Sequence, residues 1–474
     1  MQGQSEALAR AANGVLSFRE FLAWLEERDS LVRVAQPVSH EYGITELAHG
    51  YDGEKAVLLE QVEGFEIPLA FGIFNRRSFI AAALGTNDSS LLEEIIARSR
   101  SPLAPTVLEG RAPCQEIVVE QPHLLEELPF PRHYQRDAGR YCTSGVIVAR
   151  DPGGPAVNVS FARMQVCADR ILVMVNQWRH LLALFTRAES MGQDLPVGIV
   201  IGPEPALWLE GAMPDGLAPI EADEMAIAGA LGGAPIPVVR ALTSDLLVPA
   251  SAEIVIEGRM VSGRREMEGP FGDYPKIYDE PPRLNPIIVP TVLTRRADAI
   301  YQDIVPAMYE HFWLGGVPRE ADLLSSLRKR VHGVRQVHLT AGGVCRFHLV
   351  VQIDKSSDAH PREVILAALS SGESSRDIKL VTVVDSDIDP FNAEDVEWAV
   401  ATRVQWDSDL MTFSRLPVAL DPSAIGTTPR EALERGESYG AKAGLDATKP
   451  FSAGDLLSMF DKVAIPGGWK AESD

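Results

Sequence analysis

Apolar residues near the start of the chain recur with the spacing of an amphipathic helix. They fall on one helical face at Phe18, Phe21, Leu22 and Leu25. Ser17 and Glu20 have the spacing of a capping box, in which two side chains satisfy backbone N–H groups at the start of a helix. The pattern predicts a short helix that begins after Ser17.

From about residue 141 to residue 305 the pattern changes to short β-rich runs. Gly and Pro separate these runs, which include VIVAR, ILVMV, GIVIG, EIVIEG and PIIVPTVLT. Such a succession predicts a barrel or a strongly bent sheet.

Helical spacing returns around residues 320–331. Two strand-like runs, VCRFHLVVQI and IKLVTVVD, then flank the helix-like PREVILAAL, which predicts an α/β or α+β C-terminal domain. The last amphipathic segment, residues 453–463, is expected to be a terminal helix that packs on another surface or subunit.

Prolines divide the chain between residues 101 and 135, where six of them interrupt regular structure. A domain boundary is placed there. The expected division is an N-terminal α/β domain over residues 1–120, a central β-rich domain over 121–310 and a C-terminal α/β domain over 311–474.

The negative net charge of the chain argues against nucleic acid and membrane surfaces as partners. The 474 residues include 44 basic and 66 acidic side chains, a formal net charge of -22, which opposes binding to nucleic acid or to anionic lipid. The four cysteines are scattered without a CxxC pair, and no apolar run approaches the roughly 18 residues that span a bilayer. We therefore expect a cytoplasmic protein with reduced thiols.

Common catalytic motifs are missing from the sequence. HExxH, GxxxxGK[ST] and GxSxG do not occur, and the Gly-rich 229–233 lacks Rossmann spacing. The acidic run 385–389 lacks the Gly and Glu that an EF-hand needs at its sixth and twelfth positions, so a solvated loop is preferred over a calcium site.

Two carboxylates, Glu268 and Asp273, are the most informative polar residues of the β-rich part. They flank Gly-Pro-Phe-Gly, in which Pro270 biases Gly269 towards an extended form and Gly272 permits a tight turn. Paired acids beside an arginine such as Arg163 suit proton transfer near neutral pH. A surface turn with two solvated acids remains equally compatible with the spacing.

With EGPFGD at 268–273, NVSFAR at 158–163 and GLDAT at 444–448, the sequence resembles the UbiD family of prenylated-FMN decarboxylases, from about residue 15 to residue 450. The resemblance implies a central split β-barrel, related to flavin reductases, that holds the cofactor. It also implies flanking N-terminal and C-terminal α/β domains, the latter used in oligomerisation.

The same resemblance implies a metal site. Asn158, His180 and Glu224 would hold Mn²⁺ or Mg²⁺ against the cofactor phosphate, with K⁺ nearby, and a hard cation suits these oxygen and imidazole donors. Further cofactor contacts are expected from Ser160, Arg163, Arg179 and Lys379. Taken singly, His180 is more typical of a structural histidine and Glu224 of an acid that stabilises a helix N-terminus, and the alternative for Lys379 is an ordinary lysine at a strand edge.

By the resemblance, Arg163, Glu268 and Asp273 form the catalytic set, and Asp273 gives a proton to the product carbon. Many relatives have Glu where this chain has Asp273, which shortens the acid by one methylene. A cofactor is needed because no side chain can delocalise the carbanion character that loss of carbon dioxide leaves.

A substrate-lining segment is expected at residues 309–324. The candidate lining residues are Asn176, His311, Phe312, Trp313, Arg319 and Arg346. Relatives that act on phenylacrylic acids tend to have Gln where this chain has Arg179, so a more polar heteroaromatic acid, including a dicarboxylate, is expected.

The expected activity is reversible non-oxidative decarboxylation of an α,β-unsaturated or heteroaromatic acid. The expected partners are a flavin prenyltransferase that supplies the cofactor and further copies of the chain, in a homodimer or homohexamer. The alternative is an accessory or non-decarboxylating subunit that binds flavin or metal-phosphate within a larger carboxylase complex.

Overall fold

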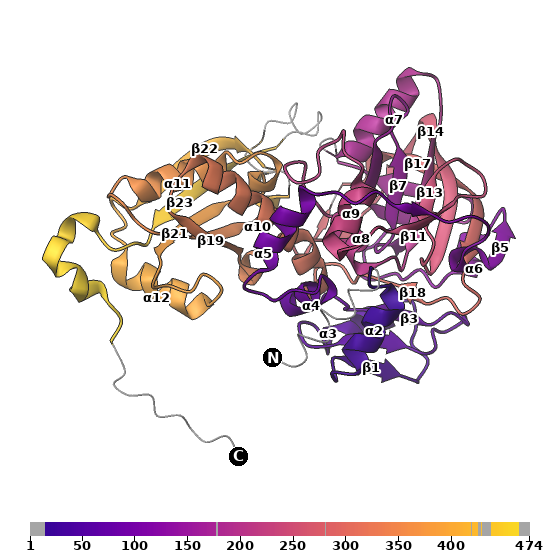
Figure 1. Ribbon diagram of the computed structural model, residues 1–474, viewed down its shortest axis with the longest axis horizontal. Helices are drawn as coiled ribbons and strands as arrows, with labels where there is room; N and C mark the ends of the chain where they lie inside the picture. Colours follow the sequence, from indigo (N-terminus) through magenta and orange to yellow (C-terminus); the bar gives the residue numbers. More distant parts are fainter. Residues whose placement is uncertain are drawn as a thin grey trace, which may run out of the picture. The chain divides into compact units, whose positions relative to one another are not determined.

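The computed structural model describes residues 15–176, 179–279, 281–418, 420–424, 428 and 438–463. The chain divides into two compact units, residues 1–322 and 323–474, and the division falls within α10 (Tyr309–Arg330) (Figure 1). No helix in the described ranges combines the length and apolar character needed to cross a membrane.

The predicted N-terminal helix is α2 (Phe18–Glu26). Its capping box is complete, because Glu20 N donates to Ser17 Oγ over 3.3 Å and Ser17 N donates to Glu20 Oε2 over 2.8 Å. The apolar face is buried. On the other side, Arg19 donates to both carboxylate oxygens of the buried Glu253, at 2.7 and 2.8 Å, which fixes the helix to the rest of the unit.

A four-stranded sheet follows in the N-terminal part of the first unit. Its order is β1 (Leu31–Val34), β2 (Ala56–Leu59), β3 (Leu69–Phe71) and β18 (Tyr301–Gln302). The pairs β1–β2 and β3–β18 are parallel, and β2–β3 is antiparallel. The associated helices are α3 (Gly43–His49), α4 (Arg77–Ala83) and α5 (Leu91–Ser99).

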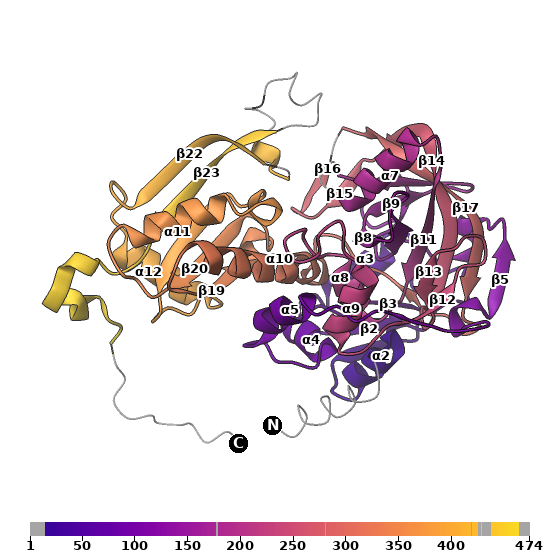
Figure 2. The ribbon, with the colours of Figure 1, turned by 45° about the horizontal axis from the view of Figure 1, so that its top comes forward.

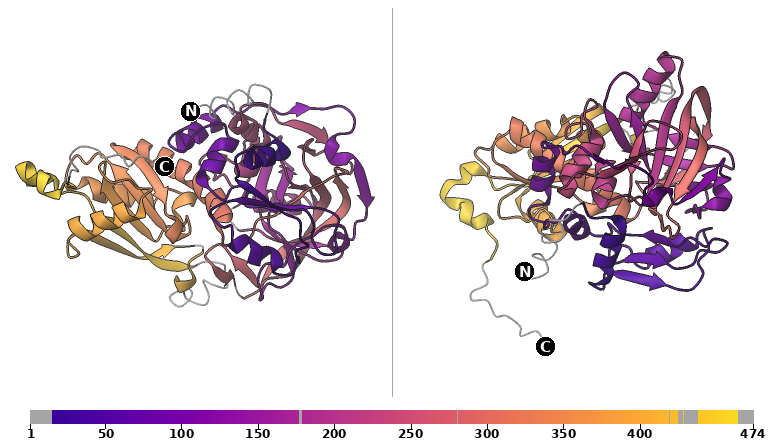
Figure 3. Two further views of the ribbon diagram at one scale, coloured as in Figure 1. Left: turned by 90° about the horizontal axis from the view of Figure 1, so that it is seen from below. Right: turned by 45° about the vertical axis from the view of Figure 1, so that its right-hand side comes forward.

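The β-rich centre forms a nine-stranded antiparallel sheet that curls into a half-barrel, as the sequence predicted (Figure 3). The path is β6 (Arg140–Cys142), β9 (Arg163–Val166), β10 (Ile171–Met174), β17 (Arg283–Arg295), β14 (Ile254–Glu268), β11 (Leu195–Ile201), β7 (Val146–Arg150) and β8 (Val157–Phe161), and β5 (Ile117–Glu120) pairs with β17. The register of β14 and β17 shifts twice. Such irregularities bend and twist strands, which suits a curled sheet.

Shorter elements border this sheet. They are β4 (Thr106–Val107), α6 (Leu124–Glu127), α7 (His180–Ser190), α8 (Pro205–Glu210), α9 (Glu224–Gly232), β12 (Pro237–Arg240), β13 (Leu247–Pro249) and the hairpin β15 (Phe271–Asp273)–β16 (Ile277–Asp279). One buried cluster joins Val57 and Phe71 of the N-terminal sheet to Ile147, Ile199 and Ile256 of the half-barrel. The two sheets therefore share a core, while the exact domain limits stay a prediction.

The second unit contains a five-stranded sheet, in agreement with the predicted α/β class. Its order is β19 (Val334–Leu339), β20 (His348–Ile353), β21 (Leu380–Asp385), β23 (Tyr439–Asp446) and β22 (Leu410–Pro417), and the three middle strands are parallel.

Helices α11 (His360–Leu369) and α12 (Ala393–Arg403) cover opposite faces of this sheet (Figure 1). A Cβ at Gly444 of β23 would lie 2.1 Å from Ile365 of α11. The next residue, Leu445, packs in a cluster with Val396 and Ala399 of α12. Successive side chains on a strand point to opposite faces, so the unit has three layers.

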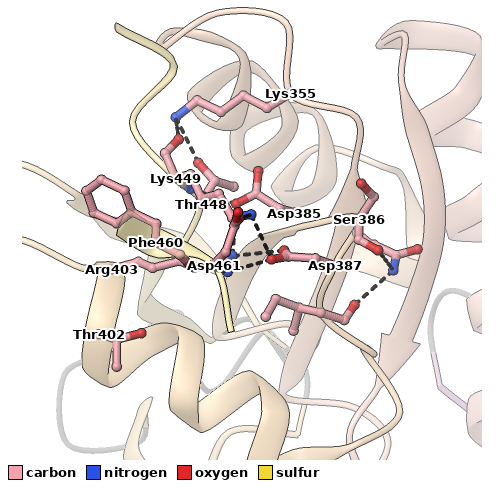
Figure 4. A network of polar contacts seen from close by, with 12 residues as sticks. Lys355, Asp385, Ser386, Asp387, Thr402, Arg403, Thr448, Lys449, Phe460 and Asp461 are labelled. Atoms are coloured by element: carbon pink, nitrogen blue, oxygen red, sulfur yellow. Dashed lines mark hydrogen bonds and ion pairs between the residues drawn. The ribbon is translucent and has the colours of Figure 1, made fainter. Parts of the chain in front are cut away.

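The acidic run after β21 takes part in a network of ion pairs (Figure 4). The buried Arg403 binds Asp385 at 3.0 Å and Asp387 at 2.8 Å, and Lys449 Nζ lies 2.8 Å from Asp387. Burial alone would raise the pKa of Asp387, but hydrogen bonds from Arg403 and Lys449 outweigh it and lower the pKa to about 2. The carboxylates of Asp385 and Asp387 are thus paired with cations of the same unit.

The same network holds the C-terminal segment. Arg403 donates to the carbonyl of Phe460, and Lys449 contacts Asp461 at 2.5 Å. The segment expected as a terminal helix is a 3₁₀ element, η6 (Phe451–Phe460), interrupted at Gly454, where φ is 54°. None of the residues of η6 is buried.

Glu310 ties the start of α10 to the N-terminal sheet. Its carboxyl oxygens accept N–H groups from Gly72 at 2.7 Å and Phe74 at 3.0 Å. Burial raises the pKa of Glu310 to about 8. The unfolded chain gives up this proton at a pKa of about 4.3.

We predict that Glu310 makes the free energy of unfolding depend on pH, and that Glu310→Gln removes this contribution. The raised pKa means that the stabilising contribution of the protonated acid is fully present below pH about 4 and is lost as pH rises towards 8, with a slope of at most about 1.4 kcal/mol per pH unit. Urea unfolding at pH 5, 6.5 and 8 measures it. Groups other than Glu310 titrate in both proteins, so identical slopes for wild type and variant would contradict the prediction.

Candidate active site

Arg163 on β9 brings the two predicted acids together. Its Nε and Nη2 donate to the two oxygens of Glu268, at 3.0 and 2.9 Å, and its Nη1 donates to Asp273 Oδ2 at 2.7 Å. The side chains of Arg163, Glu268 and Asp273 are 10%, 0% and 16% exposed. The surface-turn alternative therefore does not describe this pair.

Two further residues hold Glu268. Tyr141 donates its hydroxyl to Glu268 Oε1 at 3.1 Å, and Asn285 Nδ2 donates to Oε2 at 3.2 Å. Burial lowers the pKa of Arg163, but the charges of Asp273 and Glu268 outweigh it and raise the pKa overall. Burial, and then the charge of Glu268, raises the pKa of the Tyr141 hydroxyl. A buried ion pair needs such additional hydrogen bonds to offset its desolvation.

The backbone between the two acids differs from the expected form. Gly269 is not extended but has a φ of +92°, a conformation that glycine adopts readily because it lacks a Cβ. At Gly272 the constraint is space, since a Cβ there would lie 2.4 Å from the ring of Tyr134. Asp137 fixes the position by accepting N–H groups from Gly272 at 2.7 Å and Tyr134 at 2.9 Å.

A third carboxylate, which the sequence reasoning missed, contacts Arg163. Asp279 Oδ2 lies 2.9 Å from Arg163 Nη2, and Arg283 donates to Asp279 Oδ1 at 3.1 Å. The β15–β16 hairpin brings Asp279 back beside Phe271 (Figure 2). Its turn carries no Asn-Gly or Asp-Gly signal, so the return was not visible in the sequence.

The three predicted metal ligands also meet. Glu224, the first residue of α9, accepts a hydrogen bond from Asn158 Nδ2 at 2.8 Å and lies 3.0 Å from His180 Nδ1. His180 is the first residue of α7, so two helix N-termini face this cluster. Ser160 donates to Asn158 Oδ1 at 3.0 Å.

Carboxylates dominate the surroundings of the cluster. His180 Nε2 lies 3.1 Å from Asp215. Burial lowers the pKa of His180, but the hydrogen bonds and charges of Glu224 and Asp215 outweigh it and raise the pKa. Burial raises the pKa of Glu224, and neither oxygen of the buried Glu210 has a hydrogen-bond partner. Unpaired buried oxygens and excess acid are features that a bound cation would satisfy.

A cation would also require one change in the ligands shown. The Asn158 amide nitrogen faces Glu224, and a half-turn of the amide would present its oxygen instead. Within the described ranges, no group of three or more His, Cys, Asp or Glu side chains has metal-site geometry. The predicted ligand set contains only two such side chains, His180 and Glu224, and its third member is the amide of Asn158.

Two further predicted cofactor residues, Arg179 and Lys379, lie in different units of the chain. Arg179 is the N-cap of α7, and its side chain makes no capping hydrogen bond. Lys379 belongs to the second unit, where its Nζ donates to Asp421 at 2.9 Å and Ser423 at 3.0 Å.

The predicted lining residues lie in several environments. Asn176 is exposed, and Arg319 is buried, at 6% exposure. His311 packs edge-on against Tyr274, and Phe312 is buried beneath the same ring. Trp313 stacks on Tyr309, and Arg346 of the second unit pairs with Asp377 at 3.3 Å. Of this set, His311 and Phe312 are thus joined to the acid hairpin through Tyr274.

Comparison with known proteins identifies the family. The N-terminal, Rift-related and C-terminal domain models of 3-octaprenyl-4-hydroxybenzoate carboxy-lyase, named UbiD, match residues 22–99, 106–309 and 312–447. The chain belongs to the UbiD family. It is a carboxy-lyase, and the resemblance seen in the sequence is confirmed.

Relatives and solved structures match most of the chain. The anhydromevalonate phosphate decarboxylase of Methanothermobacter thermautotrophicus is 36% identical over 409 residues, 86% of this chain and 91% of its own. The UbiD-class enzyme HmfF from Pelotomaculum thermopropionicum, solved with FMN, is 38% identical with a TM-score of 0.88, and 95% and 98% of the two chains are covered. An evolved dimeric form of HmfF, solved with prFMN, is 37% identical with a TM-score of 0.84, and the match covers 95% of this chain and 97% of that chain.

We predict that Asp137→Ala loosens the acid hairpin of this UbiD protein without unfolding it. Gly272 N–H loses its acceptor, which costs about 1 kcal/mol and speeds its hydrogen exchange about fivefold. Exchange followed by mass spectrometry over residues 269–279 measures the effect. Asp245→Ala, which removes an exposed partner of Arg150, is the control. Equal exchange in the three proteins would contradict the prediction.

Proposed function

We propose that this carboxy-lyase reversibly decarboxylates an α,β-unsaturated or heteroaromatic carboxylic acid with prenylated FMN as cofactor. The observation that carries the proposal is the buried Arg163, which holds Glu268 by a two-point contact and Asp273 by one. Two solved structures that match 95% of this chain are complexes with FMN and with prFMN, which supports the proposed cofactor.

The metal ligands of this proposal are Asn158, His180 and Glu224, which would hold Mn²⁺ or Mg²⁺ against the cofactor phosphate. Their oxygen and nitrogen donors fit a hard divalent cation, and the surplus of buried carboxylate favours positive charge. The N-termini of α7 and α9 favour a phosphate at the same place. K⁺ is the further cation proposed, and Ser160, Arg179 and Lys379 are the further cofactor contacts.

When bound, prenylated FMN supplies the electron sink that decarboxylation requires. In our proposal Asp273 then donates the proton that replaces the departing carbon dioxide on the substrate carbon. Glu268 receives hydrogen bonds from Arg163, Tyr141 and Asn285. Its fixed charge orients Arg163, and Arg163 in turn positions Asp273.

The proposed substrate is a polar acid. Asn176, His311, Phe312, Trp313, Arg319 and Arg346 are the proposed lining residues, and arginine binds carboxylates in a two-point fork. Several curated relatives are named anhydromevalonate phosphate decarboxylase, so a phosphorylated acid is the second candidate. Activity of the purified chain alone would show that it is an enzyme and not an accessory subunit. We propose that the chain works as a homo-oligomer and that a flavin prenyltransferase supplies its cofactor.

Cofactor retention tests the metal site. We predict that protein made together with a flavin prenyltransferase and Mn²⁺ carries near-stoichiometric prenylated FMN and manganese, and that Glu224→Gln loses at least about tenfold of both, because losing a ligand charge weakens a hard cation site. Mass spectrometry and metal analysis measure the loss. Glu221→Gln, close by in sequence but exposed, is the control. Equal loading in all three proteins would refute this metal assignment.

Turnover tests the acid pair. We predict that Glu268→Gln and Asp273→Asn each reduce kcat by at least about a hundredfold while cofactor loading is kept, since the first removes the charge that fixes Arg163 and the second the proton donor. Carbon dioxide release is followed over acrylic, heteroaromatic, hydroxybenzoic and phosphorylated unsaturated acids. Glu266→Gln alters a surface pair on the same strand and serves as control. Full activity in either acid variant would show that the pair is misassigned.

A further inference from the structure

Arg163 contacts three carboxylates, but its hydrogen bonds go to only two of them. Glu268 accepts hydrogen bonds from Nε and Nη2, whereas Asp279 forms an ion pair with Nη2, in which Asp279 Oδ2 and Arg163 Nη2 are 2.9 Å apart. Asp273 has a single contact, from Nη1. Its other oxygen accepts the N–H of Tyr274 at 2.6 Å.

The side chain of Asp279 is only 20% exposed. It is also held from the solvent side, because Arg283, whose side chain is 59% exposed, donates to its second oxygen. The β15–β16 pairing, in which Asp279 lies opposite Phe271, fixes the backbone at this point. Asp279 is therefore built into the site, although neither the predicted catalytic set nor the predicted cofactor contacts include it.

The charge arrangement has a chemical consequence. A guanidinium stays charged at every working pH, and its field favours the ionised form of any nearby carboxyl group. An acid that must donate a proton works best when such a field is weakened. Asp279 is placed to weaken it, since a second carboxyl group contacts the same guanidinium as Glu268.

We infer that Asp279 is a positioning residue for proton transfer: its ion pair with Arg163 Nη2 keeps Asp273 on a single hydrogen bond from the guanidinium. The inference rests on the proposed function, in which Asp273 donates the proton. In that step the O–H bond of Asp273 breaks, a C–H bond forms at the carbon that has lost carbon dioxide, and Asp273 is left ionised until water returns a proton.

Other titratable groups surround the same hairpin. The charged and titratable side chains on and beside the hairpin include Tyr134, Arg136, Asp137, Tyr141, Glu268, Tyr274, Lys276, Tyr278, Arg283 and His311. Asp279 and Arg283 form the pair at the partly exposed side of Arg163, so they can be changed while the contacts of Glu268 with Tyr141 and Asn285 are kept.

The test compares Asp279→Asn with wild type in the cofactor-loaded enzyme across pH 5.5 to 9. Arg163 Nη2 keeps its hydrogen bond to Glu268, but its contact with the Asp279 charge is gone, so Asp273 can accept a second hydrogen bond from the guanidinium. The falling alkaline limb of the kcat profile therefore moves to lower pH by about one unit, and kcat at pH 8 drops about tenfold while KM stays within about twofold. Asp279→Glu restores the profile. Arg283→Gln moves the limb to higher pH, because Asp279 is then free to bind Arg163 alone.

A second measurement does not depend on turnover. Crystal structures of the cofactor-free full chain at pH 8 are expected to show a second hydrogen bond between Arg163 and Asp273 in Asp279→Asn, and a single one in wild type. Asp169→Asn, which removes an exposed acid beside Arg170, is the matched control and leaves both readouts unchanged.

Three outcomes would overturn the inference: an unmoved alkaline limb, a loss of kcat that is equal at every pH, or an unchanged single contact in the variant crystal. If the loaded wild type turns over no acid, the proposed function fails. The contact in the cofactor-free crystals then still decides how Asp279 shares Arg163.

Discussion

The buried guanidinium of Arg163 constrains the centre of this protein. A charge that is 10% exposed must be compensated where it lies, and the fold supplies Glu268 from the end of a fifteen-residue strand, Asp273 and Asp279 from a hairpin, and hydrogen bonds to Glu268 from β6 and β17. Strands from distant parts of the sequence must therefore keep their register for the ion pairs to exist. The geometry of the site therefore depends on the strand pairing of the curled sheet.

The metal cluster and the acid pair are linked through one short stretch of chain. Asn158 and Ser160 on β8 and Arg163 on β9 lie within six residues of each other. One part of this stretch faces Glu224 and His180 at two helix N-termini, and the other faces the carboxylates of the hairpin. In the proposed function, cofactor anchoring and proton transfer would thus depend on the same pair of strands, and residues from both sets appear in a single motif.

Much of this arrangement was predictable from the sequence. Capping and apolar spacing identified α2, and β-branched runs identified the half-barrel, because both signals are local. The grouping of Arg163 with Glu268 and Asp273, and of Asn158 with His180 and Glu224, followed from a family resemblance. Tyr141, Asp137, Asn285 and Asp279 were not foreseen, since their roles depend on strand pairing and a hairpin turn without a sequence signal. Likewise, Gly454 changes the expected terminal helix into a kinked 3₁₀ segment.

The close approach of Tyr134 to Gly272 determines how this site can vary. A Cβ at residue 272 would collide with Tyr134, whereas the side chain of residue 273 is 16% exposed. The backbone can therefore present acids of different length at residue 273 without being rebuilt. For enzyme engineering, the length of the acid at residue 273 is therefore the quantity to vary, whereas any side chain at residue 272 would require the ring of Tyr134 to move.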